Sequence, residues 1–304
     1  MKIGIIGIGK LGSIHLRICK EIQRIEEIYI VDTDKKKLQQ HTGVTHLTDY
    51  QQLCGKVDAV SIVTPTSTHF ELAKFFLERK IPVFVEKPIT SNLKEANTLL
   101  SMAKNKKTLL FVGHVERYNN AYLAAKEKIK DPIFIECHRL SPYPHRSLDV
   151  GVVLDLMIHD LDIILDLLKD DIKNVQAKGV KVISSTEDIA NVRITFKNGC
   201  VANITASRIS EKKERKVRIF MRNCYISLDY AQQEAQIYKK GAAKITKDTL
   251  PINKEEPLKK EIIEFVNLVQ NKTFDMDSAQ GARNALELAL KIQKIINEDP
   301  NNNR

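Results

Sequence analysis

The turn at residues 7–12 constrains the fold of this chain more than any other feature of its sequence. Gly7, Gly9 and Gly12 form GIGKLG, which directly follows an Ile-rich apolar run and directly precedes a segment of helical periodicity. In a dinucleotide site the first glycine makes the tight turn, the second lets the backbone approach the pyrophosphate, and the third lets helix and strand pack closely. The pyrophosphate then lies at the helix N-terminus, where free N–H groups and the positive end of the dipole face it.

Asp32 supports this interpretation of the turn. It stands at the end of the second apolar strand, about twenty residues further on, where an acid hydrogen-bonds the adenosine ribose. Together the two features predict a nicotinamide dinucleotide site. The carboxylate favours NAD because it repels a 2′-phosphate, but NADP stays open because Lys35, Lys36 and Lys37 could offset that repulsion.

Strands and helices alternate along the first third of the chain. Short apolar strands separated by helical segments are typical of a parallel sheet covered on both faces. From residue 132 the pattern changes to a strand, a helix over 152–169 and a series of strands joined by turn residues, which indicates a largely antiparallel sheet. Two amphipathic helices follow. We predict an α/β chain with a doubly wound Rossmann domain over 1–117, and an α+β domain with a large open sheet over 118–304, whose C-terminal helices could pack back on the first domain.

Composition argues against several classes of function. The chain has 304 residues with 48 Lys+Arg against 38 Asp+Glu, but its basic runs, KKERK at 212–216 among them, are scattered and lack interleaved aromatics. We interpret them as solvated faces, so no nucleic acid is expected. Five cysteines without a CxxC pair argue against a disulfide framework or a zinc ribbon, and we expect no metal. Because no apolar run of about 18 residues and no signal-peptide pattern occurs, we predict a cytoplasmic protein that does not enter a membrane.

Two segments carry residues suited to proton transfer. Lys87 in EKP follows the apolar strand IPVFV at the carboxyl edge of the sheet, where it could donate to a substrate hydroxyl and stabilise the developing alkoxide. Asp155 and His159 stand four residues apart on one face of a helix, where the acid would raise the basicity of the histidine. A surface turn and a surface ion pair are the simpler alternatives. The helix is largely apolar, however, and polar groups on such a helix favour a functional role.

In combination, GIGKLG, EKP at 86–88, VGHVERYN at 112–119 and GVVLDLMIHDLD at 151–162 resemble the Gfo/Idh/MocA family of NAD(P)-dependent sugar and polyol oxidoreductases, over nearly the whole chain. The resemblance implies a Rossmann domain followed by a substrate-binding domain whose open sheet packs against its counterpart in a homodimer or homotetramer. It implies that Lys87, Asp155 and His159 are catalytic, with either His159 or Lys87 removing a hydroxyl proton as hydride leaves the same carbon for nicotinamide C4. The residues that it places around NAD, with NADP as the alternative, are Gly7, Gly9, Lys10, Leu11, Gly12, Asp32, Thr64, Pro65, His69, Glu86 and Lys87.

The segment HRLSPYPHRSLDV at 138–150 resembles the branch of the family that oxidises the 3-hydroxyl of UDP-N-acetylglucosamine. Its arginines could bind a diphosphate through paired hydrogen bonds. The implied substrate residues are Arg117, Tyr118, Arg139, Tyr143, His145, Arg146, Asp155 and His159. Myo-inositol or a free hexose is the alternative substrate, and a non-catalytic NAD(P)-binding sensor or regulator is the alternative class of function. One departure from the family pattern is Gly151 followed by Val152, where a glycine pair is common.

Overall fold

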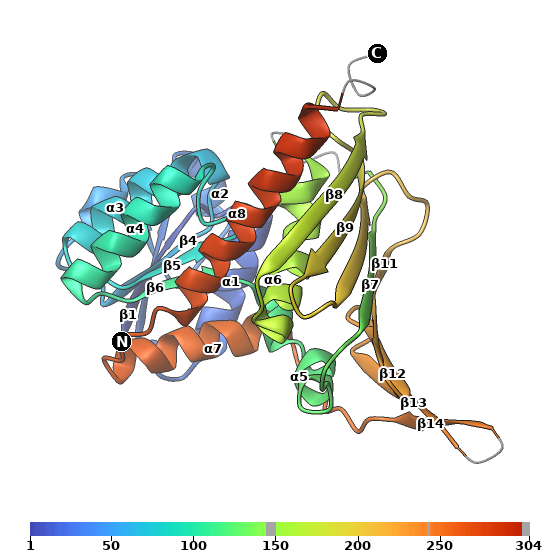
Figure 1. Cartoon of the computed structure of the whole chain (residues 1–304). Coiled ribbons are helices and arrows are strands. Elements are labelled where there is room, and N and C mark those ends of the chain that lie inside the picture. The colour runs from blue at the N-terminus through green and yellow to red at the C-terminus, as the bar shows by residue number, and fades with distance from the viewer. Residues whose placement is uncertain (144–149, 242–243, 300–304) are drawn as a thin grey trace. The chain divides into compact units, whose positions relative to one another are not determined.

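The computed structural model describes residues 1–143, 150–241 and 244–299, which form two compact units (Figure 1). Met1–His114 and Leu258–Arg283 make up the first unit, and Val115–Pro257 and Asn284–Arg304 make up the second. Each unit contains one β-sheet.

The sheet of the first unit has six parallel strands in the order β3-β2-β1-β4-β5-β6. The strands are β1 (Lys2–Ile6), β2 (Glu27–Val31), β3 (Thr45–Leu47), β4 (Ala59–Ile62), β5 (Val83–Glu86) and β6 (Leu110–Gly113). The direction of winding reverses between β1 and β4, and ligands of doubly wound sheets bind at the carboxyl ends of the strands that flank such a reversal. The predicted parallel, doubly wound sheet is confirmed.

Helices cover both faces of this sheet. They are α1 (Lys10–Glu21), α2 (Lys35–Gln39), α3 (His69–Glu78), α4 (Leu93–Lys106) and α7 (Pro257–Gln270), with 3-10 turns η1 (Tyr50–Leu53) and η2 (Thr66–Thr68). Every residue of β4, β5 and β6 is buried. The rings of Phe84 and Phe111 stack with centroids 5.3 Å apart, and Phe265 of α7 meets Phe84 edge-on at 5.6 Å. These aromatic contacts pack α7 onto β5 and β6.

The sheet of the second unit has eight strands in the order β14-β13-β12-β11-β7-β10-β9-β8. Neighbours run antiparallel except β7 and β10, which are parallel. The strands are β7 (Phe134–Leu140), β8 (Ile172–Val180), β9 (Ile189–Phe196), β10 (Val201–Ser207), β11 (Glu214–Met221), β12 (Cys224–Asp229), β13 (Glu234–Lys240) and β14 (Ile245–Thr249). The predicted large, mainly antiparallel sheet is therefore confirmed.

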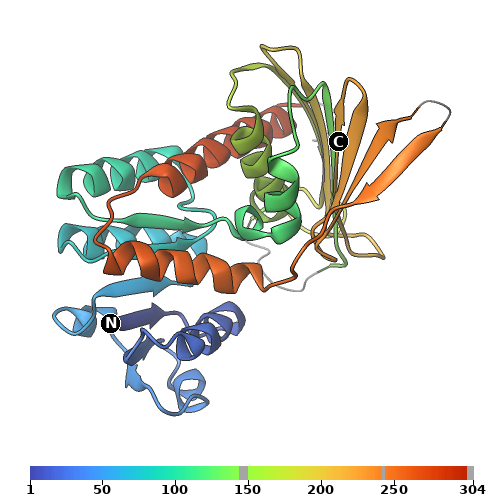
Figure 2. The ribbon, with the colours of Figure 1, turned by 90° about the horizontal axis from the view of Figure 1, so that it is seen from below.

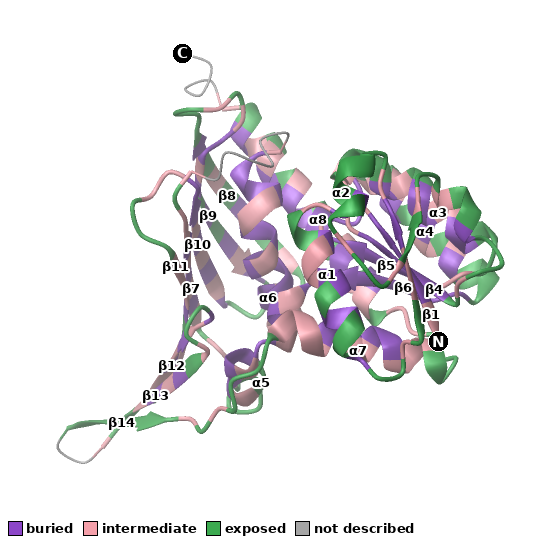
Figure 3. Cartoon of the chain, turned by 180° about the vertical axis from the view of Figure 1, so that it is seen from behind, coloured by how far each residue is buried: buried purple, intermediate pink, exposed green. Residues whose placement is uncertain are grey.

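One face of the second sheet is covered by α5 (Asn120–Lys126) and α6 (Ile158–Leu168) (Figure 2). The 3-10 turn η3 (Val115–Tyr118) and the part of α8 (Asp277–Asn297) that begins at Asn284 belong to the same unit. Along β7, buried Ile135 and Cys137 alternate with half-buried Phe134 and Glu136, as the two faces of a strand require. The half-buried residues of β7 therefore lie on the other face, which no described helix covers (Figure 2). Figure 3 shows that buried residues occur in the strands of both sheets.

The helix predicted over 152–169 begins with a different winding. Val153–Met157 form one π-helical turn, and α6 follows from Ile158. A single widened turn hardly alters the apolar periodicity, which is why the sequence pattern predicts one continuous α-helix. Such π turns are frequent at functional sites.

The five cysteines are free thiols, and Cys137 is buried on the covered face of β7. Among residues 1–143, 150–241 and 244–299, no three His, Cys, Asp or Glu side chains are grouped so that they could hold a metal ion. No helix within these ranges has both the length and the apolar character needed to span a membrane.

Candidate active site

The glycine turn has the backbone geometry that a dinucleotide site requires. Gly7 has a φ of +88°, and a Cβ atom there would lie 2.5 Å from the carbonyl oxygen of Val63. A Cβ atom on Gly12 would lie 1.9 Å from the carbonyl oxygen of Gly7, so α1 packs directly against the turn. At Gly9, in contrast, a Cβ atom would meet no described protein atom within 4 Å. The space beside the N-terminus of α1 is therefore open to a pyrophosphate, and the residues present fit the cofactor.

Asp32 is joined to this turn through the backbone. Its Oδ2 accepts a hydrogen bond of 2.9 Å from the N–H of Ile8, and its Oδ1 accepts one of 2.9 Å from the N–H of Asp34. The Nζ of Lys37 lies 3.9 Å from Oδ2. The turn thus holds the carboxylate at the end of β2, where a ribose hydroxyl could add a further hydrogen bond.

His69 joins two loops at the carboxyl edge of the first sheet. Its Nδ1 lies 2.9 Å from the carbonyl oxygen of Pro88, and its Nε2 lies 2.9 Å from that of Thr64. The side chain is only 1% exposed, and burial lowers the pKa of the imidazole below its ordinary value. Each ring nitrogen faces a carbonyl oxygen to which it donates when it carries a proton. His69 thereby fixes the position of the loop at Thr64 and Pro65 relative to the turn after β5.

Glu86 connects the strand that precedes Lys87 to α1. Its Oε1 lies 3.0 Å from Nε2 of His15, and Nδ1 of His15 lies 3.0 Å from Oγ of Ser61. His15, Ser61 and Glu86 are all buried, whereas Lys87 is partly exposed. The Lys87–Pro88 peptide bond is cis. The sequence analysis did not identify His15. The helical periodicity of the segment after the glycine turn would have placed it on the buried side.

Asp155 and His159 lie on the accessible side of a buried helical segment in the second unit. Asp155 belongs to the π turn and His159 to the first turn of α6. Both side chains are partly exposed, whereas Val153, Met157 and Ile158 are buried. Proton transfer to a substrate needs such an accessible pair.

The neighbouring acids of α6 are engaged in ion pairs within the unit. Arg139 donates from Nε and Nη2 to Asp160 at 2.8 and 2.9 Å, and from Nη1 to Glu116 at 2.9 Å. Arg117 donates from Nε and Nη2 to Asp162, both at 2.6 Å. The Arg139 side chain is 3% exposed, so its guanidinium lies in the interior.

Arg215 is a second residue that sequence reasoning missed, because it lies in the basic run interpreted as a solvated face. It is paired with Arg139 across β11 and β7, and its Nη1 lies 3.7 Å from Oε1 of Glu116. Burial and the charge of Arg139 lower the pKa of Arg215, and the charge of Arg215 lowers that of Lys213. An anion at this point would relieve the repulsion among the three cations.

The predicted site residues divide between the two units. The predicted cofactor contacts, Lys87 included, belong to the first unit, whereas Asp155, His159 and the predicted substrate contacts belong to the second. Tyr118 and Tyr143 are partly exposed. His145 and Arg146 lie outside the described residues.

Two family models match the chain. Residues 1–114 match the oxidoreductase family with an NAD-binding Rossmann fold, and residues 123–227 match the GFO/IDH/MocA C-terminal domain. The cofactor of the family is thus a nicotinamide dinucleotide.

Characterised relatives extend this match to the whole chain. The UDP-N-acetylglucosamine 3-dehydrogenase of Acidithiobacillus ferrooxidans is 32% identical over 305 residues, covering 97% of both chains, and its solved structure matches with a TM-score of 0.90. A myo-inositol 2-dehydrogenase of Thermotoga maritima is 28% identical over 229 residues, covering 68% of this chain and 69% of the relative. An NAD-binding protein from Listeria innocua shares the fold, with a TM-score of 0.83 at 21% identity over 97% of this chain and 94% of its own. On these matches and the two sheets described above, the chain belongs to the Gfo/Idh/MocA family of NAD-binding oxidoreductases.

Proposed function

We propose that this protein is a dehydrogenase that oxidises the 3-hydroxyl of UDP-N-acetylglucosamine with a nicotinamide dinucleotide as hydride acceptor. The observation that supports this choice of substrate is the match to the Acidithiobacillus enzyme, which covers 97% of both chains. The match to myo-inositol dehydrogenase covers only 68% of this chain. Oxidation of myo-inositol or a free hexose is therefore the second candidate.

The turn at Gly7, Gly9 and Gly12 would hold the pyrophosphate, with the exposed Lys10 and Leu11 beside it. Asp32 would bind the ribose, and Thr64 and Pro65 would border the cofactor at the end of β4. We propose NAD in preference to NADP because Asp32 repels a 2′-phosphate, and the Nζ of Lys37, at 3.9 Å, only partly offsets its charge.

The bound nicotinamide supplies the acceptor for the hydride. Asp155 would orient His159 and raise its basicity, so that His159 takes the hydroxyl proton. Lys87 is the alternative acceptor of that proton, and otherwise donates a hydrogen bond to the substrate oxygen. Glu86, His15 and His69 would hold the turn that carries Lys87.

The diphosphate of the substrate needs cations near the second sheet. Because Arg139 is paired with Asp160 and Glu116 in the interior, we assign it a structural role, and Arg117 likewise through Asp162. We propose Arg215 as a diphosphate contact in their place, together with Tyr118, Tyr143, His145 and Arg146, which the sequence resemblance implies. Its lowered pKa supports this assignment, since an anion would stabilise its charge.

A second copy of the chain is the proposed partner of the uncovered face of the second sheet. Phe134, Phe220, Tyr225 and Tyr238 form a half-buried row across β7, β11, β12 and β13, with ring centroids 5.5, 5.2 and 4.4 Å apart. Aromatic side chains are enriched in the cores of protein interfaces. Sedimentation should show a dimer or tetramer that Tyr225→Glu dissociates, and a wild-type monomer would refute this assembly.

The function is tested by nicotinamide absorbance with NAD or NADP and a panel of UDP-N-acetylglucosamine, myo-inositol and free hexoses. Reduced cofactor should form only with the UDP-sugar. If reduced cofactor forms only with a free polyol, the proposed diphosphate subsite is wrong. If the cofactor binds tightly but no substrate is turned over, the protein is better explained as a sensor. Lys87→Ala should abolish turnover but not NADH binding, whereas the exposed Lys56→Ala should change neither.

A further inference from the structure

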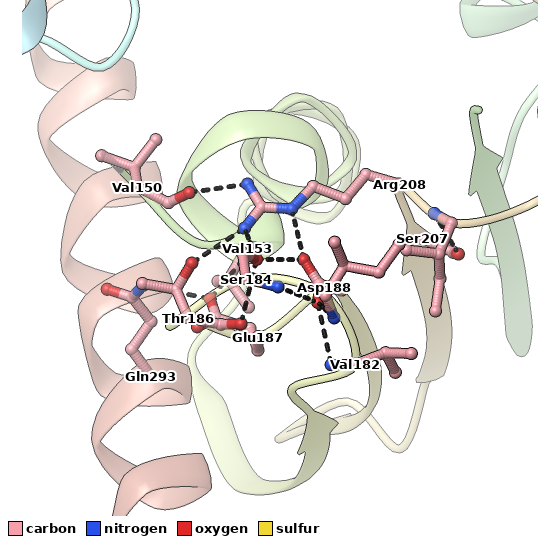
Figure 4. A network of polar contacts seen from close by, with 12 residues as sticks. Val150, Val153, Val182, Ser184, Thr186, Glu187, Asp188, Ser207, Arg208 and Gln293 are labelled. Atoms are coloured by element: carbon pink, nitrogen blue, oxygen red, sulfur yellow. Dashed lines mark hydrogen bonds and ion pairs between the residues drawn. The ribbon is translucent and has the colours of Figure 1, made fainter. Parts of the chain in front are cut away.

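A buried network in the second unit supports the helical segment that carries Asp155 and His159 (Figure 4). It combines the loop between β8 and β9 with Arg208, which follows β10, and Gln293 of α8. Arg208 and Asp188 are 0% exposed, and the Nε of Arg208 donates to Oδ1 of Asp188 at 2.9 Å. A charge buried this deeply is stable only with its partner in place, so the pair fixes its surroundings.

Asp188 determines the conformation of the loop before it. Its Oδ2 accepts from the backbone N–H groups of Val182, Ile183 and Ser184 at 2.8, 2.7 and 3.0 Å. The Ser184 hydroxyl donates to its Oδ1. Burial alone would raise the pKa of Asp188, but these hydrogen bonds hold it below its ordinary value. The loop is thereby organised around one ionised carboxylate.

Arg208 and Glu187 connect this loop to the start of the helix by hydrogen bonds. The Nη1 of Arg208 donates to the carbonyl oxygen of Val150 at 2.8 Å. The carbonyl oxygen of Glu187 accepts from the N–H of Val152 at 2.9 Å, and its Oε1 accepts from the N–H of Val153 at 3.3 Å. The Nε2 of Gln293 donates to the same Oε1 at 3.1 Å. Glu187 therefore caps the first turn from another part of the chain, and a carboxylate there suits the helix dipole.

Gly151 is the residue that allows this contact. A Cβ atom at position 151 would lie 2.0–2.2 Å from the carboxylate atoms of Glu187. The carbonyl oxygen of Gly151 accepts from the N–H of Asp155 at 3.0 Å, so the glycine also belongs to the turn that contains the acid. A side chain here would displace either Glu187 or the start of the helix. Val152, by contrast, carries a side chain that is fully buried.

We propose that Glu187 is a positioning residue, which sets the first turn of the helical segment and thereby the direction in which Asp155 and His159 face the substrate. This inference rests on the proposed function, in which Asp155 and His159 act on a sugar hydroxyl. The Arg208–Asp188 pair holds Glu187 at the helix start, and Gly151 leaves the space for its carboxylate.

The test compares Glu187→Ala, Glu187→Gln, Gly151→Ala and the double variant Gly151→Ala/Glu187→Ala. Glu187→Ala should lower kcat about tenfold to a hundredfold, the loss expected when reacting groups shift by about 1 Å. The dissociation constant of NADH should not change, because the glycine turn belongs to the other unit. Glu187→Gln should retain more kcat than Glu187→Ala, because its amide oxygen still accepts from Val153. The exposed Glu211→Ala is the matched control and should keep the wild-type kcat.

The double variant separates positioning from general damage. Because Gly151→Ala acts by colliding with the Glu187 carboxylate, its loss should not multiply with that of Glu187→Ala, and the double variant should be about as active as Glu187→Ala alone. A wild-type kcat in Glu187→Ala, or losses that multiply, would overturn the inference.

A readout independent of turnover distinguishes this inference from the proposed function. The imidazole NMR signals of His159, identified by their loss in His159→Gln, should shift in Glu187→Ala, while those of His15 and His69 stay in place. If the wild type oxidises no sugar but the His159 signals shift, the proposed function fails and the positioning stands. Unmoved His159 signals in both Glu187 variants would refute the positioning, whatever the activity.

Discussion

The Nε2 of His15 lies 3.0 Å from Oε1 of Glu86, in a contact that joins the helix after the glycine turn to the strand that leads into Lys87. The rings of His15 and Phe84 also meet in a T-shaped contact, with centroids 5.3 Å apart. The helix that would bind the pyrophosphate and the strand that positions Lys87 are therefore linked by one buried side chain. Removing that side chain should affect both stability and catalysis.

His15→Ala should destabilise the protein by about 1–3 kcal/mol, because it leaves the buried Glu86 carboxylate without its imidazole partner. It should also lower kcat, because the end of β5 loses a support. Thermal unfolding and steady-state kinetics measure the two effects. Arg17→Ala on the exposed side of α1 is the control, with a change below about 1 kcal/mol. Equal effects of the two substitutions would contradict this role.

Gly9→Ala should weaken NAD binding on the order of tenfold, about 1.4 kcal/mol, without lowering the melting temperature. The physical reason is that the added methyl group meets no described protein atom within 4 Å, yet lies where the pyrophosphate would approach. Gly12→Ala should lower the melting temperature instead, since its methyl group would lie 1.9 Å from the carbonyl oxygen of Gly7. Fluorescence titration with NADH and thermal unfolding separate the two. If Gly9→Ala leaves the NADH affinity unchanged, the pyrophosphate does not bind at this turn.

Arg215→Gln should raise the KM for the UDP-sugar about tenfold, the effect of losing one charge-assisted contact to phosphate, and leave the KM for NAD unchanged. Arg218→Gln is the matched control, because Arg218 lies on the opposite face of the same strand and pairs with Glu136 at 3.1 Å. Kinetics with UDP-N-acetylglucosamine decide the matter. If Arg218→Gln raises the KM as much as Arg215→Gln, then neither residue defines the subsite.

Asp188→Asn should destabilise the protein by about 3 kcal/mol at neutral pH, because it leaves Arg208 buried without its counter-charge. The pKa of Asp188 is lowered in the folded state, so its contribution to the free energy of unfolding is complete above the unfolded pKa of about 3.9. That contribution is lost as the pH falls through the folded pKa. Urea unfolding at decreasing pH should therefore show the gap between wild type and variant narrowing below about pH 4. A gap that widens in acid would contradict the ionised state of Asp188.

Local patterns were sufficient to predict both sheets. Fully apolar strands separated by amphipathic helices occur where both faces of a sheet are covered, and β4, β5 and β6 are buried throughout. The strand predicted from residue 132 is β7, in which buried and half-buried residues alternate. The glycine turn was recognisable because its three spacings follow from backbone contacts that any dinucleotide turn must make.

Contacts between distant residues could not be predicted in this way. Arg139 was expected to bind phosphate, but its partner Asp160 lies 21 residues further on and meets it only when α6 packs on β7. Glu187 caps a helical segment that begins at Val153, 34 positions earlier, and neither residue has a local pattern that indicates the other. The pairing of Arg215 with Arg139 depends on the order of the strands, which no property of a single strand determines.

The π turn at Val153–Met157 bears on how relatives of this chain can diverge. A π turn holds one residue more than an α turn over nearly the same rotation, so deleting a single residue there would restore regular α-helix and leave the flanking segments in nearly the same orientation. The packing of α6 on the sheet could survive such a deletion, but the widened turn that carries Asp155 could not. We expect the length of this turn to be inherited as strictly as its residues, and a one-residue gap at this point in an alignment to mark a change of substrate or a loss of activity.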